Sequence, residues 1–131
     1  SPSAWLLAAI ISLLVSNLLL LNQFPDVEAD QQVGRRHLPI VIGRRHSASV
    51  YTLLALGSYL LLLLGVAVGA LPWQSLLGLL SLPLLLKILP GIFRLADKPR
   101  ELAPYLGLNV LLCHLYPLLL SAGLYWAASG N

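Results

Sequence analysis

Long apolar stretches dominate the chain and are separated by short polar segments. Four such stretches occur, at residues 3–21, 47–70, 71–93 and 102–128. Each extends over about 19 residues or more, and a helix of that length crosses the roughly 30 Å hydrocarbon core of a bilayer. Lipid offers no hydrogen-bond partners to a bare backbone, so each stretch is expected to be helical. The pattern predicts an all-α fold, a polytopic transmembrane helix bundle with four spans, in a single transmembrane domain over residues 1–131.

The charged residues are confined to two segments between these stretches. The first segment is the loop at residues 22–46, called the motif loop below, and the second is the end of the third stretch with the loop after it. The charged side chains are Asp26, Glu28, Asp30, Arg35, Arg36, Arg44 and Arg45 in the first, and Lys87, Arg94, Asp97, Lys98, Arg100 and Glu101 in the second. With four spans, both segments lie on one side of the membrane, and their arginines and lysines favour the cytoplasmic side. We therefore expect an integral protein of a bacterial or archaeal cytoplasmic (inner) membrane, with the motif loop facing the cytoplasm.

Composition supports a membrane protein and excludes a soluble one. Hydrophobic residues make up 58% of the chain and charged residues 10%, and the mean hydropathy is +0.84. Soluble domains carry roughly 25% charged residues, so this chain has too few charges to cover a water-facing surface. The net charge is +3, but the basic residues lie beside the spans. We therefore expect the lipid bilayer as a partner and no nucleic acid.

Two acids in the motif loop are spaced to act together. Asp26 and Asp30 are four residues apart, which on a helical turn places their Cβ atoms roughly 5–6 Å apart on one face. Mg²⁺ is often held by one or two carboxylates together with substrate phosphates. Arg35 and Arg36 follow, and their guanidinium groups match phosphate oxygens. These residues suit a metal-bound polyphosphate.

A simpler interpretation of the motif loop stays open at this stage. The loop would then be a solvated connection whose arginines only set the membrane topology. For Arg44 and Arg45 this is the preferred interpretation. It also covers His37, which follows the arginine pair and is otherwise a candidate for contact with phosphate.

The stretch from Asn22 to Gly43 resembles the second aspartate-rich motif of the UbiA superfamily of intramembrane prenyltransferases. The matching residues are Asn22, Asp26, Asp30, Gly34 with the basic pair after it, Leu38 and Gly43. Among the branches of the superfamily, the pattern looks most like the 1,4-dihydroxy-2-naphthoate prenyltransferases of menaquinone synthesis. Superfamily members have nine transmembrane helices, so the resemblance implies that this chain corresponds to helices six to nine.

The resemblance also implies an activity and a role for each matching residue. The activity is Mg²⁺-dependent transfer of a polyprenyl group from its diphosphate to an aromatic acceptor, in the synthesis of quinones or related lipids. Asp26 and Asp30 would be the catalytic, metal-binding pair. Arg35 and Arg36 would bind the diphosphate, and Asn22 would assist as a polar ligand or orient an aspartate. The aromatic acceptor and the length of the prenyl chain are left open.

One departure from the superfamily pattern limits this interpretation. The first aspartate-rich motif of the superfamily has no counterpart here, since Asp97 and Glu101 do not form it. We therefore expect the chain alone to be catalytically incomplete and to act with a missing N-terminal half or in a larger membrane complex. The alternative function is that of a non-catalytic transmembrane subunit, derived from a prenyltransferase, that binds quinone, lipid or pigment.

Three polar residues of the fourth stretch are candidates for lining a cavity. They are Tyr105, Asn109 and His114. An ionisable group in the middle of a span is expensive in lipid, so His114 is expected to face the interior of the bundle. Its alternative role is that of a neutral histidine hydrogen-bonded to a neighbouring helix.

Overall fold

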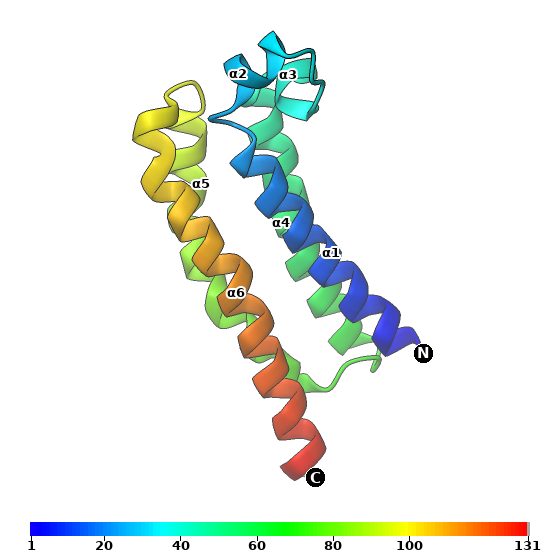
Figure 1. The fold of residues 1–131 in the computed structure, drawn as a ribbon. Helices are drawn as coiled ribbons and strands as arrows, with labels where there is room; N and C mark the ends of the chain where they lie inside the picture. The colour runs from blue at the N-terminus through cyan, green and yellow to red at the C-terminus, as the bar shows by residue number, and fades with distance from the viewer. Residues whose placement is uncertain (131) are drawn as a thin grey trace.

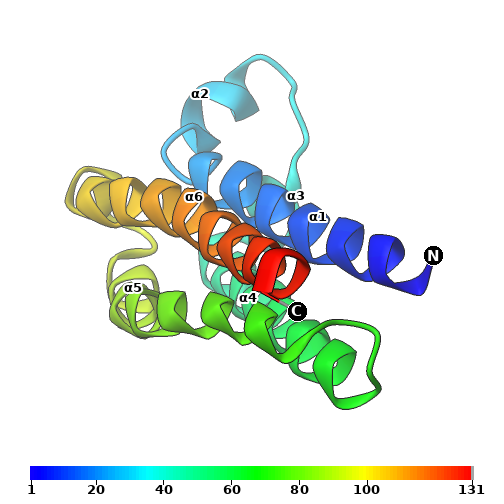
Figure 2. The ribbon, with the colours of Figure 1, turned by 90° about the horizontal axis from the view of Figure 1, so that it is seen from below.

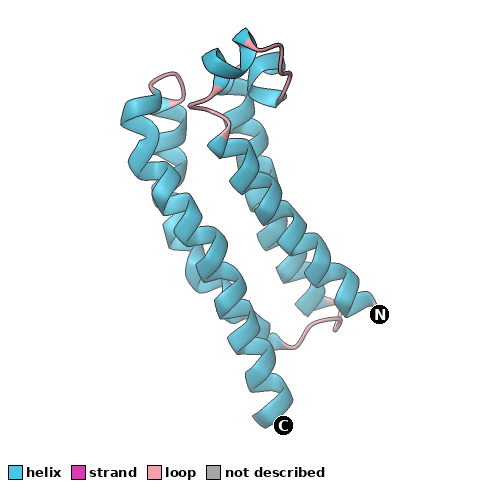
Figure 3. Ribbon diagram, in the orientation of Figure 1, coloured by secondary structure: helices cyan, strands magenta, loops and turns pink. Residues whose placement is uncertain are grey.

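The computed structural model describes residues 1–130, which fold into helices joined by short loops and contain no strand (Figure 1, Figure 3). In chain order the elements are α1 (Pro2–Asn22), α2 (Val27–Gln32), α3 (Leu38–Ile42), α4 (Arg44–Ala67), the 3-10 helix η1 (Trp73–Ser81), α5 (Leu82–Leu95) and α6 (Pro99–Gly130). Four helical segments are long and apolar enough to cross a membrane, and η1 with α5 forms the third of them. The predicted all-α bundle with four spans is therefore confirmed.

The third span differs from a plain α-helix in its first half. Residues 73–81 form a 3-10 helix, in which residues three apart lie above one another on the same face. Ser75, Gly78 and Ser81 occupy that face and are buried. The Ser75 and Ser81 hydroxyls donate to backbone carbonyls three residues earlier, at 2.5 Å and 2.6 Å. This period of small residues, which apolar content alone does not reveal, lets the segment pack closely on its neighbours.

The spans pack as two pairs, α1 beside α4 and the third span beside α6 (Figure 1, Figure 2). Glycines allow close contact within the second pair. A Cβ on Gly123 of α6 would lie 2.1 Å from the backbone oxygen of Gln74, and one on Gly91 of α5 would lie 2.2 Å from the ring of Tyr105. Small residues at such contacts are characteristic of helix association in membranes, because they let backbones approach.

Hydrogen bonds made by buried polar side chains link α1 to α4 within the first pair and link α4 to the second pair. On α4, Tyr51 accepts at its backbone oxygen from Asn17 Nδ2 (3.1 Å) and donates its hydroxyl to Asn109 Oδ1 of α6. The Tyr59 hydroxyl lies 2.6 Å from Ser81 Oγ. Tyr116 of α6 donates to the backbone oxygen of Ser58 at 3.0 Å, and its ring stacks on that of Tyr59. These bonds fix the rotation of the helices, because a polar group left unpaired in a dry interior is costly.

Both charged segments lie at one end of the bundle, and both chain ends and the turn before η1 lie at the other (Figure 1). At that second end Trp73 and Trp126 meet edge to face, with ring centroids 4.9 Å apart. At the first end the Arg45 Nε lies 3.8 Å from Asp97 Oδ2, so the two charged segments touch. The motif loop is thereby placed over the end of the helix bundle.

Candidate functional site

The motif loop folds into two short helices at the charged end of the bundle. After Asn22 the chain turns around Phe24, whose side chain is fully buried. Asp26 precedes α2, and Gly34 (φ +78°) and Gly43 (φ +85°) lie before α3 and α4. Glycine adopts positive φ without steric cost, so these two positions let the chain change direction between the short helices.

A cavity of about 440 Å³ opens on this loop. It is lined by Gln23, Asp26, Asp30, Arg35, Arg36 and His37. The backbone N–H of Asp30 donates to the carbonyl oxygen of Asp26 at 2.8 Å, so the two acids lie one helical turn apart. The structure thus brings together Asp26, Asp30, Arg35 and Arg36 with His37, the weaker candidate from the sequence, and it adds Gln23.

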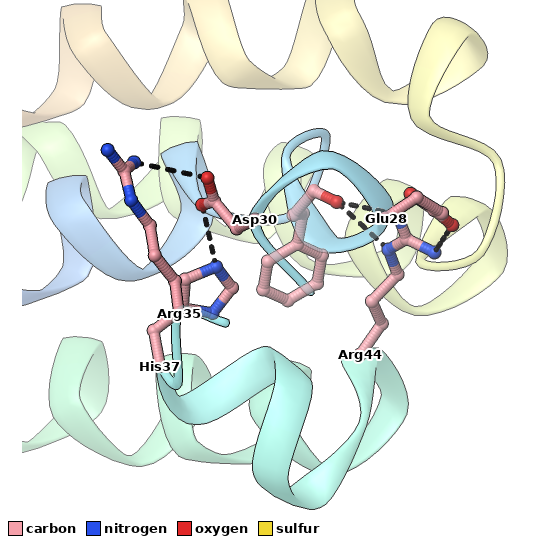
Figure 4. A network of polar contacts seen from close by, with 6 residues as sticks. Glu28, Asp30, Arg35, His37 and Arg44 are labelled. Carbon is pink, nitrogen blue, oxygen red and sulfur yellow. Dashed lines mark hydrogen bonds and ion pairs between the residues drawn. The ribbon is translucent and has the colours of Figure 1, made fainter. Parts of the chain in front are cut away.

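Asp30 is held by two partners within the cavity (Figure 4). Arg35 Nη1 donates to one carboxylate oxygen at 3.1 Å, and His37 Nε2 lies 3.0 Å from the other. The side chain of His37 is 13% exposed, and its Nδ1 is buried without a hydrogen-bond partner in the described part of the chain. The negative charge of Asp30 is therefore compensated before any ligand arrives.

Asp26 and Arg36 carry charges that no neighbour compensates. Asp26 stands at the N-cap of α2, a position where aspartate commonly bonds the helix, yet its side chain makes no capping bond. Within residues 1–130 neither the Asp26 carboxylate nor the Arg36 guanidinium has a hydrogen bond or ion pair, and both line the cavity. The cavity therefore presents one free acceptor and one free cationic donor.

Arg44, the first residue of α4, reaches across to the motif loop (Figure 4). Its Nε and Nη2 donate to the carbonyl oxygen of Phe24 at 2.9 Å and 2.7 Å. Its Nη1 and Nη2 also donate to the two carboxylate oxygens of Glu28, both at 2.9 Å. The hydrogen bonds from Arg44 hold the pKa of Glu28 below its usual value. We expected a topological role for Arg44, but its side chain is only 9% exposed and bridges two parts of the loop.

The donor set fits Mg²⁺ only in company with a phosphate ligand. No group of three or more His, Cys, Asp or Glu side chains among residues 1–130 is placed to hold a metal ion. Mg²⁺ retains several waters and often takes one or two carboxylates plus substrate phosphates. Asp26 and Asp30 supply that number of carboxylates, and Arg35 and Arg36 line the same cavity.

The other sequence candidates lie outside this cavity. Asn22 ends α1, is exposed and is not among the lining residues. Asn109 is buried under Tyr51, and Tyr105 packs over Gly91. His114 was expected to face the interior of the bundle but is exposed on the outer face of α6, where its Nδ1 lies 2.6 Å from the carbonyl oxygen of Val110.

Two residues of the site had weak or no signals in the sequence. His37 followed the arginine pair and was considered for phosphate contact, but its bond to Asp30 is visible only in three dimensions. The pairing of Arg44 with Glu28 joins residues sixteen positions apart in sequence, beyond any helical spacing rule. One feature of the sequence could have indicated this pairing. Glu28 stands between the two aspartates, and a third acid in that stretch needs a cationic partner of its own.

Four helical segments long and apolar enough to cross a bilayer define an integral membrane protein, and acids and arginines line a cavity at its charged end. The model of the UbiA prenyltransferase family matches residues 1–110. This match covers more than half of the chain, so the chain belongs to the UbiA prenyltransferase family.

Two curated relatives are similar to the chain over 113 residues, or 86% of its length. One is the 2-carboxy-1,4-naphthoquinone phytyltransferase of Synechocystis sp., at 28% identity. The other is the 1,4-dihydroxy-2-naphthoate octaprenyltransferase of Haemophilus influenzae, at 33% identity. The chain spans 37% of the first relative and 36% of the second. No solved structure matches the chain.

Proposed function

We propose that this chain supplies the acid-and-arginine half of the diphosphate site in the transfer of a polyprenyl group from its diphosphate to an aromatic acceptor. The observation that carries the proposal is the cavity lined by Asp26, Asp30, Arg35 and Arg36 at the charged end of the spans. Family membership and the two naphthoate prenyltransferase relatives support it. A naphthoate acceptor, and hence synthesis of menaquinone or a related quinone, follows by analogy with the relatives' names.

The chemistry asks for charge stabilisation where the diphosphate leaves. The allylic C–O bond of the prenyl diphosphate breaks, pyrophosphate departs, and an aromatic carbon attacks the allylic carbon and loses its proton. Mg²⁺, held by Asp26 and Asp30, would supply positive charge to the leaving group. Arg36 faces the ligand without a competing partner, and Arg35 exchanges one Asp30 oxygen for a phosphate oxygen.

The lipid-facing surface of the spans gives the prenyl tail of the substrate a place to bind. Exposed leucines line the outer faces of the spans, among them Leu19, Leu53 and Leu111. A prenyl tail is as apolar as a lipid chain, so it lies along these faces while its diphosphate reaches the cavity. We place the motif loop on the cytoplasmic side of a bacterial or archaeal inner membrane, where the arginines and lysines of both charged segments favour it.

Two uncompensated charges favour this enzymatic proposal over a non-catalytic subunit that binds quinone, lipid or pigment. A subunit without a diphosphate ligand gains nothing from having Asp26 and Arg36 line one cavity without a partner among residues 1–130. A neutral quinone or pigment would gain little from either group, since both are best satisfied by a doubly charged, metal-bound anion.

A transfer assay with matched variants tests the proposal. Membranes containing the protein as expressed from its own gene are incubated with farnesyl diphosphate, 1,4-dihydroxy-2-naphthoate and Mg²⁺, and the prenylated product is quantified. Asp26→Ala and Asp30→Ala are expected to abolish product while leaving membrane insertion intact. Asp97→Ala, at an exposed acid outside the cavity, is the control and retains product. Turnover retained by Asp26→Ala would refute the metal-binding role.

A further inference from the structure

We infer that Arg44 is the positioning residue of the diphosphate site and that Glu28, the acid between the two site aspartates, is its anchor rather than a metal ligand. The inference rests on the proposed function, and it adds a role that neither the spacing of the acids nor the arginine pair indicates. It starts from α2, the short helix that carries Asp30 and begins after Asp26.

The helix α2 cannot hold its own orientation. It has six residues and no buried residue, and isolated helices of fewer than about 12 residues are marginal in water. Its packing on the rest of the chain is slight, and its main neighbour is the still shorter α3, with five residues. An external contact is therefore needed to aim the two aspartates into one cavity.

Arg44 provides this contact on both sides of Asp26 (Figure 4). Its donors hold the carbonyl oxygen of Phe24, two residues before Asp26, and the carboxylate of Glu28, two residues after it. Planar guanidinium groups favour such paired contacts, which fix geometry as well as distance. Arg44 begins α4, and the buried residues of the next turn, Ser47 and Ala48, seat that end of the helix in the bundle. The clamp thereby transmits the position of a transmembrane helix to the acid-bearing turn.

Glu28 is committed to this clamp. Both of its carboxylate oxygens accept from Arg44 at 2.9 Å, and it is not among the residues that line the cavity. Of the three acids in the stretch from Asp26 to Asp30, two line the cavity and the middle one faces α4. The three acids therefore divide between two tasks, ligand binding and attachment of the turn.

The test measures how strongly Mg²⁺ promotes the binding of pyrophosphate. The protein as expressed from its own gene is reconstituted in lipid nanodiscs, and inorganic pyrophosphate is titrated by calorimetry with and without Mg²⁺. Arg44→Gln is expected to lower the Mg²⁺-dependent affinity about tenfold and the Mg²⁺-free affinity little, because the free Arg36 still attracts the anion. Arg44→Lys keeps the charge but lacks the fork, so it recovers only part of the loss. Arg45→Gln is the control, since its side chain is 76% exposed and its partner lies 3.8 Å away.

A double-variant cycle distinguishes a clamp from a general loss of charge. If Glu28 is the partner, Glu28→Gln with Arg44→Gln binds no more weakly than Arg44→Gln alone. Far-UV circular dichroism of each variant must match the unaltered chain, which shows that the four spans are intact. Unchanged Mg²⁺ promotion in Arg44→Gln and Arg44→Lys, or an equal loss in Arg45→Gln, would overturn the inference alone. Failure of the unaltered protein, as expressed from its own gene, to bind Mg²⁺ and pyrophosphate would instead overturn the proposed function and this inference with it.

Discussion

At the scale of single residues, the charges of the cavity fall into a compensated set and a free set. Asp30 is paired with Arg35 and His37, whereas Asp26 and Arg36 face the cavity without partners. Two carboxylates one helical turn apart repel each other, and the Arg35 contact reduces that repulsion while no metal is bound. Arg35 therefore has two competing partners, the Asp30 carboxylate and an incoming phosphate.

This competition predicts opposite effects of one substitution on two ligands. Arg35→Gln frees an oxygen of Asp30, so Mg²⁺ alone is expected to bind more tightly, by several-fold. Pyrophosphate in the presence of Mg²⁺ is expected to bind about tenfold more weakly, because a phosphate-binding donor is lost. Calorimetric titrations of the protein, expressed from its own gene and reconstituted in nanodiscs, measure both affinities, with Arg100→Gln as an exposed control. A change of both affinities in the same direction would contradict the competition.

Glu28 makes the clamp sensitive to acid in a defined range. Its pKa is lowered, chiefly by the hydrogen bonds from Arg44, from an ordinary value of 4.5. A carboxyl group with a lowered pKa in the folded state stabilises that state above its ordinary pKa, and the contribution is lost as the pH falls through the lowered value.

The motif loop is therefore expected to keep its order at pH 5 and to lose part of it only below 4.5. The measurement is the mobility of a spin label attached to Gln31→Cys, an exposed position of α2, after Cys113, the one cysteine of the sequence, is replaced by alanine. In Glu28→Gln the label should already be mobile at pH 7 and should respond less to acid. An equally sharp acid transition in that variant would assign it to another group.

At the scale of elements, close backbone contact decides how the third span meets α6. Gly123 lies against the backbone of Gln74, which cannot rotate away as a side chain can. Gly107 of the same helix has nothing within 4 Å of its Cβ position. The two glycines thus form a matched pair, one at a contact and one in open space.

Gly123→Ala is expected to destabilise the bundle by about 1–3 kcal/mol, because the new methyl group forces η1 and α6 apart. Gly107→Ala is expected to be neutral or slightly stabilising, since alanine is the better helix former. Thermal unfolding of both variants in detergent, followed by circular dichroism, measures the difference. Equal midpoints for the two variants would show that the contact at Gly123 is not tight.

The sequence predicted some of these elements and not others, for physical reasons. The four spans follow from apolar length, because the bilayer sets a minimum length for each helix. The placement of Asp26 and Asp30 one turn apart follows from local helix geometry. The 3-10 form of residues 73–81 was missed because apolar length does not distinguish it from an α-helix, and the burial of Ser75 and Gly78 against other helices is visible only in three dimensions.

At the scale of the whole molecule, the site depends on contacts between distant segments. Arg44 reaches back to Glu28, and Arg45 reaches forward to Asp97 in the loop between α5 and α6. Neither pairing follows from a spacing in the sequence. The sequence therefore predicted for both arginines only a role in setting the membrane topology. His114 was misplaced for a related reason, since the rule that polar groups face inward does not say which helices complete the interior.

The central claim is that Asp26 and Asp30 together ligate a divalent cation that carries a diphosphate. Mn²⁺ in place of Mg²⁺ makes this ligation measurable. Electron–nuclear double resonance detects magnetic nuclei, such as ³¹P and ¹³C, in the groups that bind the paramagnetic Mn²⁺ ion. The protein as expressed from its own gene is prepared with ¹³C-labelled aspartate carboxyl groups, reconstituted in nanodiscs and loaded with Mn²⁺ and pyrophosphate. We predict both ³¹P and ¹³C couplings, with the ¹³C signal reduced in Asp26→Asn and in Asp30→Asn. A ³¹P coupling without any ¹³C coupling would contradict the account, because the metal would then bind pyrophosphate but no aspartate. A ³¹P coupling that stays unchanged in both variants would agree with that result.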